Sequence, residues 1–90
     1  MSGAVMKKIA ALLRDGEPRT LRQLVNELGL KYESVWYACK THPLIYIDHW
    51  RIADGAAAQW VAVYAIADEP VDTPRPTIKP QDYKRDQANH

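Results

Sequence analysis

The stretch TLRQLVNELGLKYESVWYACK, residues 20–40, predicts two short helices joined by a tight turn. Thr20 and Gln23 have the spacing of a capping box, in which the hydroxyl accepts from the third helical amide and the glutamine side chain reaches back. Gly29 suits the left-handed backbone that ends such a helix, because it has no Cβ. The first helix is therefore expected to begin at Thr20 and to end before Gly29. Its expected buried stripe is Leu21, Leu24, Val25 and Leu28.

The second helix of the pair is expected at about 32–41, with Lys31 near its N-terminal cap. Pro43 favours an end of this helix near His42, because the residue before a proline avoids the α conformation. Helical spacing divides the side chains into two faces. The expected buried face is Val35, Ala38, Cys39 and His42. The expected exposed face is Lys31, Glu33, Trp36, Tyr37 and Lys40.

A further helix at about 4–14 precedes the pair, and Asp15-Gly16 ends it. Its apolar side chains recur at helical spacing, so it is expected to pack on the other two helices around a single core. The apolar face of this helix is Val5, Ile9, Leu12 and Leu13. The residues expected at the centre of the common core are Leu12, Leu24, Leu28 and Val35.

After Pro43 the pattern changes to two runs rich in β-branched and aromatic residues, LIYIDHWRIA and QWVAVYAIA, which predict a hairpin with its tip near Gly55. In the first run the large apolar residues are odd-numbered at the start, Ile45 and Ile47, and even-numbered at the end, Trp50 and Ile52. A bulge is therefore expected near Asp48-His49. A short extended piece at Arg19-Thr20 is a candidate third strand. Three aromatic residues are expected in the core of the sheet: Trp50, Trp60 and Tyr64.

Composition changes again after residue 69. Residues 70–90 are rich in proline and poor in apolar side chains, which predicts a flexible, extended tail that cannot order itself by burial. Residues 1–69 are expected to form the single folded domain.

The charge and cysteine content exclude few functions. The net charge is only +1, but residues 1–40 hold more bases than acids and residues 41–69 more acids than bases, an asymmetry that could orient the domain on a phosphate backbone. An ordinary solvated surface accounts for it equally well. The single cysteine excludes an internal disulfide and fits a reducing cytoplasm. The start of the chain is a poor secretion signal, and no apolar run is long enough to cross a bilayer as a helix.

The order helix, helix, turn, helix and hairpin resembles the winged helix-turn-helix family over about residues 4–67. The match is most specific in LVNELGLKYESV, where Val25, Gly29, Leu30 and Val35 have the spacing of the helix-turn-helix motif. The hairpin and the Pro-rich end also look like those of small regulators carried by bacteriophages and prophages. The resemblance implies an α+β winged helix-turn-helix fold with an extended C-terminal tail.

The resemblance also implies sequence-specific binding of double-stranded DNA and transcription regulation in the cytoplasm, with the helix at 32–41 in the major groove. The positions it assigns to base reading or groove lining are Lys31, Tyr32, Glu33, Trp36, Tyr37 and Lys40. The positions it assigns to phosphate contact are Thr20, Arg22 and Ser34. This chain departs from the family at the hairpin tip, residues 54–58, which has one acid and no base where a wing that enters the minor groove usually has a base.

Trp36 and Tyr37 leave the function open. They fit groove contact, but Trp and Tyr are also enriched at the energetic centres of protein interfaces. A different rotation of the helix would instead bury Trp36 in part. The alternative function is therefore a winged-helix adaptor that binds a protein, either a host factor or a second copy of the chain, through Trp36 and Tyr37.

Cys39, His42 and His49 are too few for a structural zinc site, which takes four ligands, so no metal or other cofactor is expected. Cys39 and His42 could pair as nucleophile and base, but the sequence shows no third group and no oxyanion site. The chain is therefore not expected to be an enzyme. Cys39 is expected to be a small core residue, and His42 to be a cation or cap at the helix end.

Overall fold

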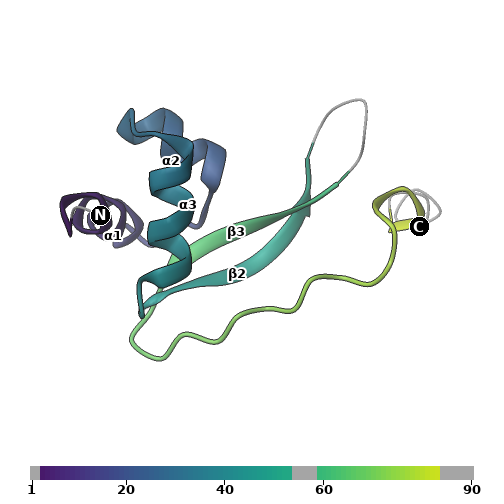
Figure 1. Cartoon of the computed structure of the whole chain (residues 1–90). Helices are drawn as coiled ribbons and strands as arrows, with labels where there is room; N and C mark the ends of the chain where they lie inside the picture. Colours follow the sequence, from purple (N-terminus) through teal and green to yellow (C-terminus); the bar gives the residue numbers. More distant parts are fainter. Residues whose placement is uncertain (1–2, 54–58, 84–90) are drawn as a thin grey trace.

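The computed structural model of the chain describes residues 3–53 and 59–83. It shows a small α+β protein in which three helices gather at one end of a three-stranded antiparallel sheet (Figure 1). The α+β class expected from the sequence is thus confirmed. A short helical turn follows at residues 80–83. The elements are α1 (Gly3–Leu13), β1 (Arg19–Thr20), α2 (Leu21–Leu28), α3 (Tyr32–Thr41), β2 (Ile45–Ile52) and β3 (Trp60–Ile66).

The core lies between the three helices and the adjoining end of the sheet. Its largest fully buried side chains are those of Ile9, Leu13, Leu24 and Val35. Leu24 and Val35 are central, as expected. Leu12 and Leu28 are only partly buried and pack against the cluster from outside. The expected apolar face of α1 is therefore rotated slightly, so that Leu13 takes the central place that the sequence suggested for Leu12.

The start of α2 and the turn after it have the predicted geometry. The Thr20 hydroxyl accepts from the Gln23 amide at 3.2 Å, and Gln23 Oε1 accepts from the Thr20 amide at 2.9 Å, which completes the capping box. Gly29 has φ 64° and ψ 32°, and its amide donates to the carbonyl of Val25. These contacts set the direction in which the chain enters α3.

The sheet has the strand order β1-β3-β2. The expected third strand is confirmed, since Arg19 pairs with Tyr64 and Thr20 with Val63. The expected bulge is confirmed as well, as a register shift between Ile47 and His49 where β2 pairs with β3. The extra residue explains why the inward-facing side chains of β2 change from odd-numbered to even-numbered positions. The predicted hairpin tip, 54–58, lies outside the described residues.

Trp50 and Trp60 were expected in the core of the sheet, and this prediction is wrong. Both are half-buried and lie outside the core cluster, which does include Tyr64. The Trp50 indole donates to the carbonyl of Thr73 at 2.7 Å, and the Trp60 indole donates to the carbonyl of Ile78 at 2.8 Å. The two indoles are therefore occupied by the C-terminal tail.

Residues 70–79 of the tail have no helix or strand, in keeping with the expected extended form, but the tail residues that the structure describes do not leave the surface of the protein. It runs along the outer side of β2, away from the helices (Figure 1). The Thr73 amide donates to the carbonyl of Ile47 at 2.9 Å, and the Ile47 amide donates to Asp72 Oδ1 at 2.8 Å. The sequence predicts a flexible tail because this segment has too few apolar residues to make a core. The contacts seen here are instead polar and edge-on, and they do not require a core.

Candidate functional site

The outward face of α3 carries exposed aromatic and basic side chains. Val35, Ala38 and Cys39 are buried, so the helix has a fixed rotation. The opposite side chains are all exposed, so α3 has the rotation expected from its apolar residues, and Trp36 lies on its outward face with part of its ring covered. Trp36 is 42% exposed and Tyr37 is 44% exposed. The residues of this outward face are Glu33, Trp36, Tyr37 and Lys40.

Two of these side chains support each other. Lys40 Nζ lies 5.0 Å from the centre of the Trp36 ring, one helical turn away. At this distance the ammonium group is attracted by the face of the indole. The contact holds a positive charge above a flat apolar surface, and both groups remain accessible to a ligand.

The N-terminal end of α3 is open. Lys31 is the N-cap residue and makes no side-chain cap hydrogen bond. Tyr32 is 56% exposed, and Ser34 is half-buried. The first amides of a helix carry a partial positive charge and attract anions. Lys31 adds a full charge at the same end, while Glu33 in the first turn opposes it.

A groove of about 640 Å³ separates the start of α2 from the hairpin. Arg22 and Tyr32 line it from the helices, and Arg51, Gln59 and Trp60 line it from the strands. The two arginines give the groove a positive lining. Of the predicted phosphate contacts, Arg22 is exposed and belongs to this groove.

Thr20 also lines the groove, but its position differs from the expectation of an exposed phosphate ligand. The residue is 4% exposed, and its hydroxyl oxygen already accepts from the Gln23 amide. Its main role in the structure is to start α2.

Arg51 is the groove residue that the sequence does not reveal. It is distant along the chain from Arg22, and it is the only base in residues 41–69. The pairing of Arg51 with Val61 places it on the hairpin stem beside the start of α2. Only the register of the sheet brings the two arginines to one groove.

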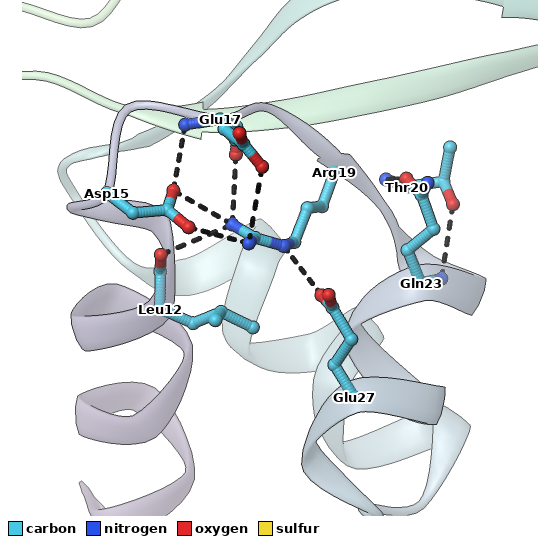
Figure 2. Close-up of polar contacts among 7 residues, drawn as sticks. All are labelled: Leu12, Asp15, Glu17, Arg19, Thr20, Gln23 and Glu27. Atoms are coloured by element: carbon cyan, nitrogen blue, oxygen red, sulfur yellow. Dashed lines mark hydrogen bonds and ion pairs between the residues drawn. The ribbon is translucent and has the colours of Figure 1, made fainter.

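Arg19, outside the groove, has a structural role that the sequence also did not suggest (Figure 2). Its guanidinium donates to both carboxylate oxygens of Asp15, at 3.0 and 2.6 Å, and pairs with Glu27 at 2.6 Å. It also donates to the carbonyls of Leu12 and Glu17. The side chain is only 10% exposed, so Arg19 ties the end of α1 to α2 and is not free for a ligand.

This network shifts the pKa of Asp15. The hydrogen bond from Arg19 is the main cause, and the hydrogen bond from the Glu17 amide adds to it, so that the pKa of Asp15 falls from 3.8 to about 2. The same pairing raises the pKa of Arg19. The pair is therefore charged at neutral pH.

The thiol and imidazole groups that could have formed a catalytic pair or a metal site are used in the fold. Cys39 is 3% exposed, and burial raises the pKa of its thiol to about 12, which keeps it protonated and unreactive. His42 is the C-cap of α3, as expected, and its Nδ1 accepts from the Leu44 amide. Within residues 3–53 and 59–83, no three His, Cys, Asp or Glu side chains are grouped so as to hold a metal ion.

A polar cluster marks the bulge in β2. Asp48 accepts from His49 Nδ1 at 2.8 Å and from the Tyr46 hydroxyl at 3.0 Å. The hydrogen bond from His49, followed by that from Tyr46, lowers the pKa of Asp48. The Asp48 carbonyl also accepts from the Thr73 hydroxyl at 2.7 Å, so the cluster belongs to the junction between the tail and β2.

Comparison of the chain with protein-family models, with curated proteins and with solved structures finds no match. In the part of the chain that the structure describes, no helix has the length and apolar character needed to cross a membrane.

Proposed function

We propose that the chain is a winged helix-turn-helix protein that binds double-stranded DNA, with α3 in the major groove and the β2–β3 hairpin as the wing. The order of elements and the antiparallel sheet β1-β3-β2 support this fold. The resemblance to small phage and prophage regulators supports a cytoplasmic transcriptional regulator.

The observation that carries the proposal is the outward face of α3. A single helix fits the width of the major groove, where base edges offer acceptors to lysine and apolar area to aromatic rings. Lys31 and Lys40 supply charge at the two ends of the helix, with Trp36 and Tyr37 between them. The buried face of α3 fixes its rotation and leaves these side chains accessible.

The groove beside α3 supports the same proposal. Arg22 and Arg51 line opposite sides of it, next to the exposed Tyr32. A phosphate backbone that follows α3 in the major groove would pass over the start of α2, where Arg22 lies. In this arrangement Arg51, on the hairpin stem, supplies the positive charge that the residues of the tip lack.

The test is a titration of random duplex DNA at several salt concentrations. Lys31→Ala and Lys40→Ala are expected to weaken binding, and each lost phosphate contact reduces the log–log salt slope by about 0.9. Lys8→Ala, an equal loss of charge on the exposed side of α1, is the matched control and should leave the slope close to that of the unmodified chain. Equal effects of all three changes would contradict a specific role for α3.

A second candidate function is a protein adaptor. Trp36 and Tyr37 are both large exposed rings on α3, and such residues are enriched at the energetic centres of protein interfaces. Under this alternative, Trp36→Ala would abolish a protein complex, while the Lys31 and Lys40 changes would leave DNA binding unaltered.

A further inference from the structure

The tail is held by hydrogen bonds and one ring contact at a defined binding site on the hairpin, called here the seat. Thr73 pairs with the edge of β2 through its amide and hydroxyl, and Asp72 accepts from the Ile47 amide. Further along the tail, the Tyr83 ring lies edge-on to the Trp60 ring, with centres 5.4 Å apart. Each of these contacts ends on β2 or β3. The hairpin side of the seat consists of Ile47, Asp48, Trp50 and Trp60.

The connection between β3 and this seat is short. β3 ends at Ile66, and the Ala67 amide donates to the carbonyl of Leu44. Residues 68–71 must then reverse the chain around the start of β2. Pro70 stiffens this hinge, and Val71 within it is 78% exposed. The fold therefore leaves an apolar side chain in water at the point where the tail turns back.

We propose that the tail of one copy can occupy the β2 edge of a second copy, so that two chains form a dimer by reciprocal exchange of residues 72–83. Exchange keeps every tail contact given above, because the same groups meet across two chains. Only the conformation of the hinge differs. The exchange of identical elements is a low-cost route to a two-fold dimer, and a row of free backbone groups on a strand edge accepts an extended segment readily.

The strength of the exchange depends on the hinge. A tail on a short tether competes at an effective concentration in the millimolar range. The unmodified chain is therefore expected to be mostly monomeric at micromolar concentration and to dimerise as its concentration rises. If the hinge is too short to fold back, the tail cannot bind within its own chain. Dimers should then form at lower protein concentrations. The proposal does not depend on DNA binding.

The first experiment shortens the hinge. Deletion of residues 68–70 leaves two residue steps between Ala67 and Asp72, a reach of roughly 7 Å. Ala67 lies on the side of β2 that faces β3, whereas Asp72 lies at the outer edge of β2, so roughly two strand spacings, about 10 Å, separate them in addition to the rise along the strand. The tail then cannot reach its own seat, and the variant is expected to sediment as a dimer at micromolar concentration. The matched control replaces the same three residues with glycines. It keeps the hinge length and should remain monomeric.

A second change in the shortened chain tests the contacts. Asp72→Ala together with Thr73→Val removes the two side-chain hydrogen bonds of the tail with β2, from the Ile47 amide and to the Asp48 carbonyl, while the backbone contacts of residue 73 with Ile47 and Trp50 remain. The dimer of the shortened chain should therefore dissociate at a higher concentration. A shortened chain that stays monomeric would overturn the proposal. So would a dimer that is unaffected by the changes at Asp72 and Thr73, because it would form through another surface.

A complementation experiment tests exchange with an unaltered hinge. One full chain carries Trp50→Phe and Trp60→Phe, which weaken its seat but leave its tail intact. The other carries Asp72→Ala and Thr73→Val, which weaken its tail but leave its seat intact. The internal pairing of tail and hairpin is thus weakened in both chains, and only the mixture brings an unaltered tail together with an unaltered hairpin. Native mass spectrometry should show a one-to-one heterodimer only in the mixture. Absence of that species would contradict exchange.

Discussion

Arg19 joins three parts of the chain, because its guanidinium contacts the end of α1, the loop before β1 and Glu27 in α2. It is also a strand residue, paired with Tyr64. The helical and sheet parts of the fold therefore meet at one buried side chain. This explains why the acids around it are held in place although they are themselves partly exposed.

The network predicts how stability responds to acid. The pKa of Asp15 falls from 3.8 to about 2 in the folded chain, so its contribution is fully present above pH 3.8 and is lost as the pH falls toward 2. The free energy of unfolding, measured by urea at a series of pH values, should fall in this window. In Asp15→Asn the fall between pH 4 and pH 2 should be smaller. An identical acid dependence in the two chains would contradict the role given to the pair.

Leu24 offers a test of the core at the scale of one side chain. It is completely buried between the helices, so Leu24→Ala should reduce the free energy of unfolding by about 2–5 kcal/mol, from lost transfer energy and a residual cavity. Leu12→Ala is the matched control, and its cost should be smaller because Leu12 is only partly buried. A cost below about 1 kcal/mol for Leu24 would mean that the phase of α2 is wrong.

At the scale of elements, the turn at Gly29 fixes the angle between α2 and α3. Its φ of 64° is disfavoured for a side chain with a Cβ, although no atom lies within 4 Å of the position that a Cβ would take. Gly29→Ala should therefore cost about 1–2 kcal/mol through backbone strain alone. Gly29→Asn should cost less, since Asn tolerates this conformation. Equal costs, measured by thermal unfolding, would point to a steric cause instead.

The features that the sequence predicted correctly depend on local spacing. The capping box at Thr20 and Gln23, the turn at Gly29 and the bulge after Ile47 each follow from residues a few positions apart. The rotation of α3 was also predictable, because Val35, Ala38 and Cys39 mark its buried face. These features could be predicted because each is determined by residues close together in the sequence.

The features that the sequence did not predict depend on contacts between distant residues. Arg51 lines the groove only because of the register between β2 and β3. Arg19 contacts Glu27 only because α2 packs beside it. Trp50 and Trp60 were expected in the core because of their size, but the tail provides hydrogen-bond acceptors for their indoles. A proline-rich segment gives no apolar pattern that would reveal such a partner.

In the whole molecule, the candidate DNA-binding surface and the surface covered by the tail are separate. The outward face of α3 and the neighbouring groove carry the basic and aromatic side chains. The edge of β2 is covered by the tail. If the tail exchanges between two copies, each dimer presents two α3 faces, as a regulator of a two-fold symmetric DNA site requires.

We propose above that the outward face of α3 contacts DNA. This proposal is tested most directly by recording amide NMR spectra of the full labelled chain as a random duplex is added. The largest shifts are expected in α3 between Lys31 and Thr41 and near Arg22, with little change in α1. Shifts confined to α1 or to the tail, or no shifts when the duplex is in excess at low salt, would contradict it.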